Sequence, residues 1–244
     1  MRLTPRCMNL LRLLAAARWL TTRQIHRRFF ARRTVDAARK RLRKLAAARY
    51  LVAHREGRMH QALYAVGREG RRVLEAESSI AVALERRPPT QREHFLAVND
   101  VRIAAELAGD LSYFFAYWEL PGLGWKHPLI PDAVFSLAGR TYALEFDRGG
   151  EGIGYFMRTK IAAYDRGLDG FPVDALLIVA DREPRLRSLR EAIGGKRAAV
   201  FATVEDIRRN GLKGVLTGSP REERGSETQV IASEGIAGAG SPAS

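Results

Sequence analysis

A run of four residues, Arg86-Arg87-Pro88-Pro89, divides the sequence into two parts of different character. Prolines cannot lie inside a helix, so no helix continues through this stiff, polar segment. A chain of 244 residues is long enough to form two domains, each with its own hydrophobic core. We therefore expect an N-terminal domain with a linker helix over residues 1–87 and a second domain over residues 90–217. The Gly-, Ser- and Glu-rich tail over residues 218–244 is expected to be disordered.

The positive charge of the chain is concentrated in its first third. Residues 1–73 contain 20 Lys/Arg and 3 Asp/Glu, net +17, whereas the rest of the chain contains 21 Lys/Arg and 24 Asp/Glu, net −3. Such an asymmetry favours a polyanion as the partner of the N-terminal domain alone. The other arginine-rich N-terminal pattern, an organellar transit peptide, is rich in serine, and here no serine precedes Ser78.

Apolar runs and cysteine usage exclude several other classes of protein. The longest uninterrupted apolar run, residues 175–180, is far shorter than the ~18 residues of a membrane span. No signal-type apolar segment follows Met1. Because Cys7 is the only cysteine, an internal disulfide and a cysteine-rich zinc site are both excluded. We expect a cytoplasmic protein that does not contact membranes.

The N-terminal third predicts three short helices followed by a β-hairpin. Apolar residues recur at helical spacing in three segments, and Thr21 and Thr34 are placed to cap the second and third. Two strand-like segments then flank Glu56-Gly57-Arg58, which is typical of a hairpin loop. The expected ranges are 5–17, 22–30 and 35–48 for the helices, and 50–55 and 61–66 for the strands.

The third of these helices has the pattern of a recognition helix. Its apolar stripe of Val35, Ala38, Leu42 and Leu45 faces the core, so its basic residues face outward. Three helices and a basic wing form a winged helix-turn-helix, whose third helix enters the major groove of double-stranded DNA. Single-stranded RNA is disfavoured because the aromatic residues lie at core positions. The expected DNA-contacting residues are Arg33, Thr34, Arg39, Lys40, Arg43, Lys44, Arg55, Arg58 and His60.

The second part alternates strands and helices in the manner of an α/β layered domain with a mixed sheet. Its first helix is expected to begin after Thr90 as N-cap, and residues 171–180 read as a strand that is buried on both faces. The fold class is therefore α+β. The expected helices are 90–109, 155–167, 184–193 and 204–210, and the expected strands are 113–119, 130–137, 141–147, 171–180 and 198–203.

The two strands around Gly139-Arg140 are expected to form a hairpin with a type II′ turn. In that register Asp132 lies opposite Asp147, and Val134 lies opposite Glu145. One face of the hairpin is then apolar, and the other gathers the carboxylates of Asp132, Glu145 and Asp147. Such a cluster requires open solvent, a basic side chain or a divalent cation such as Mg²⁺, and the sequence leaves these alternatives open.

Several segments, taken in order, resemble the replication-relaxation family of plasmid and integrative-element proteins. They are LTPRCMNLLRLL, LTTRQIHRRFF, AARKRLRKL, HFLAVNDVRIA, PDAVFSL, YALEFDRGGEG and KIAAYDR, and they extend from Leu3 to about Gly211. The resemblance implies DNA binding during replication or mobilisation of mobile elements.

The second domain also resembles the restriction-endonuclease fold, which carries Pro-Asp on one strand and Glu-x-Lys on the next. Pro131-Asp132 and Glu145-Phe146-Asp147 match this pattern in part. Asp147 stands where the fold has its lysine, which puts cleavage in doubt, and Lys160 on the following helix is a candidate replacement.

Three hypotheses follow. The first is a non-catalytic protein that binds double-stranded DNA. The second is a metal-dependent DNA nickase or nuclease, in which Asp132 and Glu145 hold Mg²⁺ or Mn²⁺, Asp147 assists, and Lys160 stabilises the phosphate charge. The third is a pseudo-nuclease scaffold that docks a relaxase, a replication protein or a second copy of the chain as a homodimer.

Overall fold

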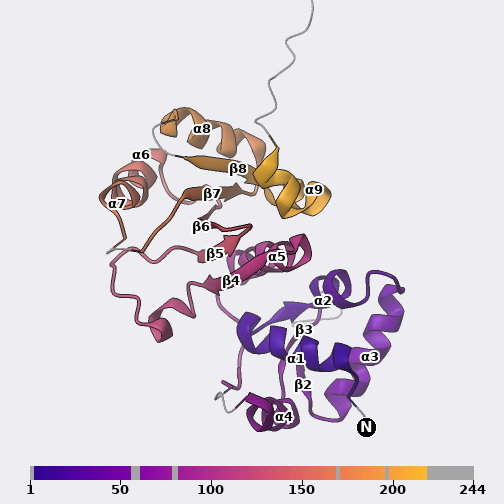
Figure 1. Ribbon diagram of the computed structural model, residues 1–244. Helices are drawn as coiled ribbons and strands as arrows, with labels where there is room; N and C mark the ends of the chain where they lie inside the picture. Colours follow the sequence, from indigo (N-terminus) through magenta and orange to yellow (C-terminus); the bar gives the residue numbers. More distant parts are fainter. Residues whose placement is uncertain (1–2, 56–60, 79–81, 169–170, 196–197, 219–244) are drawn as a thin grey trace, which may run out of the picture.

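The computed structural model describes residues 3–55, 61–78, 82–168, 171–195 and 198–218 (Figure 1). The fold is α+β, with one three-stranded antiparallel sheet and one five-stranded mixed sheet. The expected disordered tail from residue 219 onward lies outside the described residues, as do the hairpin loop and its candidate residues Arg58 and His60. Within the described ranges, no helix combines the length and the apolar character needed to cross a membrane.

The N-terminal unit, from α1 to α4, has the helices and strands that the periodicity predicts. Thr21 and Thr34 cap α2 and α3 as expected, and Thr21 also forms a reciprocal capping box with Gln24. A strand of two residues, β1, was not predicted because two residues show no periodicity; it pairs with β3. The elements are α1 (Pro5–Ala17), β1 (Leu20–Thr21), α2 (Thr22–Phe29), α3 (Val35–Ala47), β2 (Leu51–His54), β3 (Leu63–Val66) and α4 (Arg68–Ser78).

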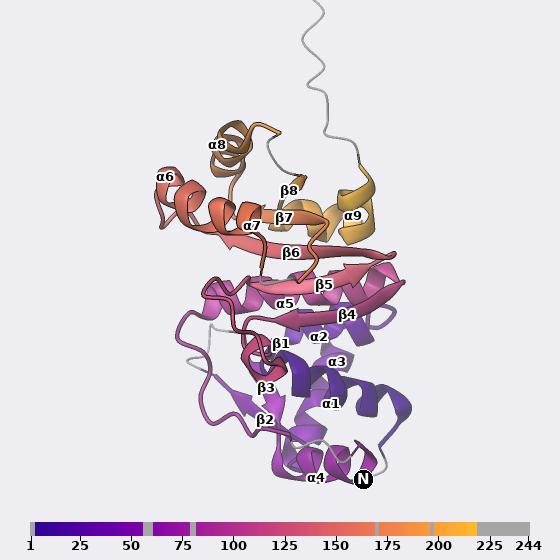
Figure 2. The ribbon, with the colours of Figure 1, turned by 60° about the vertical axis from the view of Figure 1, so that its left-hand side comes forward.

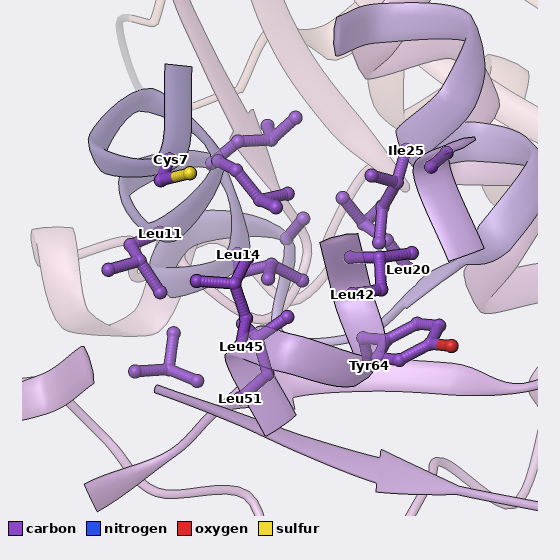
Figure 3. Packing of buried hydrophobic residues seen from close by; sticks show 14 of the residues in the cluster. Cys7, Leu11, Leu14, Leu20, Ile25, Leu42, Leu45, Leu51 and Tyr64 are labelled. Atoms are coloured by element: carbon purple, nitrogen blue, oxygen red, sulfur yellow. The ribbon is translucent and has the colours of Figure 1, made fainter. Parts of the chain in front are cut away.

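The core of this unit packs α1, α2 and α3 against the small sheet (Figure 3). Leu42 and Leu45 of α3 are fully buried with Leu14 of α1 and Ile25 of α2, as the helical stripe predicts. Val35 departs from the prediction, because it is 39% exposed. It is the first residue of α3, where the helix projects beyond the core, so the apolar stripe begins at Ala38 instead.

The second unit, from α5 to α9, is built on the mixed sheet of order β4-β5-β6-β7-β8. The first three strands form an antiparallel meander, and β7 and β8 run parallel to β6. The elements are α5 (Arg92–Ala108), β4 (Leu111–Ala116), η1 (Leu120–Leu123), β5 (Ala133–Leu137), β6 (Arg140–Asp147), α6 (Ile153–Phe156), the π-helical turn η2 (Met157–Ile161), α7 (Ala162–Arg166), β7 (Ala175–Ala180), α8 (Glu183–Ile193), β8 (Ala199–Thr203) and α9 (Val204–Thr217).

One expected helix start is wrong. The N-cap of α5 is Gln91 rather than Thr90, and its side chain makes no capping hydrogen bond. The expected end of the last helix at Asn210 coincides with a break inside α9, because Gly211 has a non-helical backbone with φ of 69° and a second helical segment follows it to Thr217. Glycine adopts a positive φ without steric cost, so it is suited to this break.

Helices cover both faces of the mixed sheet (Figure 2). Helices α5 and α9 pack on one face, and α6, α7 and α8 pack on the other. Strand β7 lies between these layers and is buried along its whole length, as its continuous apolar sequence predicts, but it begins at Ala175 and not at Phe171 as expected. Polar side chains on either face of the central strands are therefore covered by helices and are not exposed to bulk solvent.

The hairpin of β5 and β6 has a different register from the expected one. Its two-residue loop is Ala138-Gly139, with φ of 50° and 76°, and Leu137 lies opposite Arg140. Positive φ at both positions is the geometry of a type I′ turn, whereas a type II′ turn was expected. Val134 consequently lies opposite Ala143 and not opposite Glu145. The register differs by two residues, and an even shift leaves every side chain on its expected face.

Helix α5 joins the two units, and it lies between them in Figure 1. The amide of Asn99, which is fully buried, donates from Nδ2 to the backbone oxygens of Ala17 (3.0 Å) and Trp19 (3.2 Å). Gln24 of α2 donates to the backbone oxygen of Leu96, and Arg28 forms an ion pair of 2.6 Å with Glu106. The N-terminal unit is thus held on α5 by buried hydrogen bonds as well as by charge.

Candidate functional site

The outward face of α3 carries the exposed cations that the sequence predicts. Burial of Leu42 and Leu45 turns Lys40, Arg43 and Lys44 toward the surface, where all three are exposed. None of these three forms an ion pair with any residue that the structure describes. Three cations without intramolecular partners keep their full capacity to bind an external anion.

An open cleft of about 760 Å³ runs between α3, the start of α2 and strand β3. Four arginines and a single acid are among the charged residues around it. Arg39 and Arg43 reach it from α3, and Arg55 reaches it from the end of β2. We call this cleft the basic groove; its lining is Thr22, Arg23, Val35, Asp36, Arg39, Arg43, Arg55, Gln61, Ala62 and Tyr64.

The other predicted contact residues that the structure describes do not line this groove. Thr34 caps α3 through its side chain, which accepts from the backbone nitrogen of Ala37. Arg33 lines a second, smaller pocket of about 340 Å³ on the opposite flank of α3, together with Arg6 and Arg41. Lys40 and Lys44 point outward beside the groove. Of the nine predicted residues, Arg39, Arg43 and Arg55 are the ones that share one cleft.

The smaller pocket contains the only cysteine. Arg41 donates from Nη2 to the Cys7 sulfur at 3.0 Å, and the Thr4 hydroxyl lies 3.2 Å from the same sulfur. Burial by itself would raise the pKa of the Cys7 thiol, but the hydrogen bonds from Thr4 and Arg41 outweigh it and lower the pKa. Arg41 is thereby held against α1 and is not directed outward like its neighbours on α3.

In the second unit, Glu145 lies at the centre of a buried ion-pair cluster. Only 1% of its side chain is exposed, and Lys160 donates from Nζ to its Oε2 at 2.7 Å. The Tyr164 hydroxyl donates to the other oxygen. Lys160 lies in the π-helical turn η2, and Tyr164 follows four residues later in α7. Single π-turns within helices occur frequently at functional sites, because they re-aim side chains that a regular helix would direct elsewhere.

Asp132 and Asp147 each have their own partners. His94 Nε2 of α5 lies 2.8 Å from Asp132 Oδ1, and the backbone nitrogen of Phe146 donates to Asp132 Oδ2 at 2.6 Å. Arg185 of α8 forms a two-pronged ion pair with Asp147, at 3.0 and 2.8 Å. Bidentate pairing of this kind is the strongest form of arginine–carboxylate contact.

Burial and, to a smaller extent, the negative charge of Asp132 raise the pKa of Glu145 to about 7, against the opposing effect of Lys160 and Tyr164. Burial would lower the pKa of Lys160, but the neighbouring Glu145 outweighs this and raises the pKa to about 12. Lys160 therefore stays protonated at neutral pH, while Glu145 titrates near neutrality.

The three carboxylates do not form the expected cluster. In the described part of the chain, no three His, Cys, Asp or Glu side chains are grouped so that they could hold a metal ion. The expectation of open solvent is also wrong, because Glu145 and Asp147 are buried under α6, α7 and α8. Of the alternatives that the sequence left open, basic side chains neutralise this face.

The donor set offers little free capacity to a divalent cation in this arrangement. Mg²⁺ binds carboxylate oxygens whose lone pairs are directed at a common point, and it completes its shell with water. Here every carboxylate oxygen of Asp132, Glu145 and Asp147 already accepts a hydrogen bond from the protein. A metal ion would have to share these oxygens with the protein donors or displace some of them.

Three further residues contact these carboxylates but were not predicted to do so from the sequence. They are His94, Tyr164 and Arg185. The position of Tyr164 could have been inferred, since residues four apart lie on the same face of a helix and Lys160 was already a candidate. His94 and Arg185 are separated from their aspartates by 38 residues each. Nothing in the local sequence pattern indicates such pairings.

Comparison with known proteins gave one match. Neither the curated proteins nor the solved structures provided a match to this chain. Among protein families, the one described as replication-relaxation matches residues 11–169, which is more than half of the chain. The matched region includes α3, the basic groove and the β5–β6 hairpin with Asp132, Glu145 and Lys160. The chain belongs to the replication-relaxation family.

Proposed function

We propose that this chain binds double-stranded DNA through α3 and the basic groove. Membership of the replication-relaxation family suggests a role in the replication or mobilisation of plasmids or other mobile elements, and we place DNA binding, including a regulatory use of it, within that role. The observation that carries the proposal is the basic groove, in which Arg23, Arg39, Arg43 and Arg55 surround one cleft beside an exposed helix face.

The order of elements supports a winged helix-turn-helix for the N-terminal unit. Helices α2 and α3 follow a short strand, and a hairpin of β2 and β3 follows α3, with sheet order β1-β3-β2. In helix-turn-helix proteins the second helix of the motif lies in the major groove, which is wide enough to admit one α-helix. Helix α3 is that helix here, and Arg55 at the end of β2 belongs to the wing.

Lys40 and Lys44 are assigned to the phosphates that border the groove. A lysine ammonium is a compact point charge with no preferred orientation, which suits the DNA backbone more than a base edge. Arg33 precedes the helix and Thr34 caps it, so both are placed to contact a phosphate at the start of α3. These contacts would fix the position of α3 on the duplex without reading its sequence.

The experiment is a measurement of duplex affinity against salt concentration for the triple variant Lys40→Ala, Arg43→Ala and Lys44→Ala. Loss of three phosphate contacts should weaken binding and reduce the log–log salt slope by about 3. A matched variant replaces Arg158, Arg166 and Arg187, three exposed arginines of the second unit, by alanine. It removes the same charge and should leave the slope unchanged. An unchanged affinity and slope in the α3 variant would refute the proposal.

We infer that residues 90–217 are a restriction-endonuclease-like domain that has lost cleavage. The support is the order α5, β4, β5, β6, α6–α7, β7, with Asp132 and Glu145 on or next to adjacent strands and Lys160 on the helix that follows. The nuclease alternative is less well supported, because the carboxylates are occupied by Lys160, His94 and Arg185. A scaffold that docks a relaxase, a replication protein or a second copy of the chain is the role we propose for it.

A further inference from the structure

Asp36 is an anomaly on the surface proposed to face DNA. It is the only acid in the first 55 residues of the chain. Among the described residues that line the basic groove it is again the only acid, and 85% of its side chain is exposed. A carboxylate at this position repels every phosphate nearby, so it lowers the affinity for all DNA sequences alike.

The contacts of Asp36 indicate what it does. Arg39, three residues later on α3, donates from Nη1 to Asp36 Oδ1 at 2.9 Å, and both side chains line the groove. Arg39 is 57% exposed, so its other guanidinium donors remain open to the groove. An isolated exposed ion pair contributes little to stability. Its main effect here is on orientation, because it restricts a long and flexible arginine to one direction.

A phosphate is a poor ligand for this pair. The carboxylate of Asp36 would stand close to any phosphate that Arg39 held, and two like charges at that distance repel each other. A base edge carries no net charge and avoids this conflict. Guanine presents O6 and N7 in the major groove, and the planar guanidinium donates to both at once. In helix-turn-helix proteins, residues near the N-terminus of the recognition helix contact base edges, and Asp36 and Arg39 lie in the first turns of α3.

We propose that Arg39 recognises a guanine in the major groove and that Asp36 is the positioning residue that holds Arg39 in place. This inference rests on the proposed function and deepens it, because it assigns sequence selectivity to one side chain. Lys40 and Lys44, by contrast, would contribute affinity without selectivity.

The experiment selects bound duplexes from a random-sequence pool with the full chain and with three variants. Arg39→Lys keeps the charge but removes the two-pronged donor, so the preference for guanine at one position of the selected motif should fall about 5- to 100-fold. Asp36→Asn removes the negative charge and weakens the contact that orients Arg39, because only a neutral amide oxygen remains to accept from it. It should reduce the same preference while random-sequence duplex is bound more tightly. Arg187→Lys makes the same exchange on the exposed face of α8 and should leave the motif intact.

The outcomes distinguish failure of this inference from failure of the proposed DNA binding. If the full chain enriches a motif whose guanine preference is unchanged in Arg39→Lys, the inference is overturned and DNA binding stands. Duplex binding with no sequence preference also overturns the inference alone. If Asp36→Asn weakened binding to all sequences equally, its role would be structural and the positioning assignment would fail. If the full chain binds no duplex, the proposed function itself fails.

Discussion

Lys160 Nζ lies 2.7 Å from Glu145 Oε2 in a pocket that excludes water from the carboxylate almost entirely. The two residues come from different layers, because Glu145 is on the central strand β6 and Lys160 is in the π-helical turn that covers it. A buried pair of this kind need not stabilise the fold relative to apolar residues, but loss of one partner leaves the other charge without compensation. The pair therefore ties the stability of the second unit to pH.

Replacement of Lys160 by methionine should destabilise the protein more at high pH than at low pH. At about pH 8 the Glu145 carboxylate would be buried without its partner, at a cost of about 3–5 kcal/mol. At about pH 5 it can take up a proton, which removes most of that cost. Urea unfolding at both pH values measures the difference. Lys126→Met, at an exposed lysine of the same unit, is the control, and equal losses at the two pH values would contradict the assignment.

Glu145→Gln isolates the titration of the carboxylate itself. Burial raises the pKa of Glu145 from 4.5 to about 7 in the folded chain. The proton is held more tightly in the folded state, so the stabilisation from protonation is full below pH 4.5 and is lost as the pH rises to about 7. Glutamine does not titrate, so the Glu145→Gln variant does not lose stability in this way as the pH rises. The unfolding free energy of the variant relative to wild type should thus rise by about 3 kcal/mol across this range. A difference that does not vary with pH would exclude a raised pKa.

Addition of Mg²⁺ or Mn²⁺ should change neither the melting temperature nor the integrity of bound DNA. A cation that binds the folded state raises the melting temperature once its concentration exceeds its Kd, and here protein donors already bind the carboxylate oxygens. Melting curves recorded with the metal and with a chelator test the first part of this prediction. A plasmid nicking assay tests the second. Metal-dependent nicking that Glu145→Ala abolishes would restore the nuclease hypothesis and overturn ours.

Local patterns in the sequence were sufficient for the helices α1 to α3 and the β2–β3 hairpin of the N-terminal unit, but not for the short strand β1. The caps at Thr21 and Thr34 and the stripe of Ala38, Leu42 and Leu45 depend on residues within a few turns of each other, and all of them are found. The apolar face and the carboxylate-bearing face of the β5–β6 hairpin were also predictable, since strand alternation survives an even register shift. Turn geometry was not predictable, because it depends on Ala138 adopting a positive φ, which alanine does only when its surroundings enforce it.

The carboxylate cluster shows what local sequence patterns cannot predict. The sequence places Asp132, Glu145 and Asp147 on one face of a hairpin, so the three negative charges were expected to lie close together. Their basic partners are contributed by α5, by the turn η2 and by α8. Only the packing of these helices on the sheet brings a basic side chain to each carboxylate.

Asn99→Leu should weaken the attachment of the N-terminal unit to α5. The Asn99 amide donates to the backbone oxygens of Ala17 and Trp19, which lie between α1 and β1. Leucine has the same branching but a larger volume and no donor, so it would leave buried carbonyl oxygens without this hydrogen bond, at a cost of at least about 1–3 kcal/mol. Asn210→Leu makes the same exchange at an exposed position of α9 and should cost much less. Because α5 also packs on the mixed sheet, the loss should appear in the unfolding of both units. If the variant melted like wild type, the amide would not be what holds the N-terminal unit in its fixed orientation on the second unit.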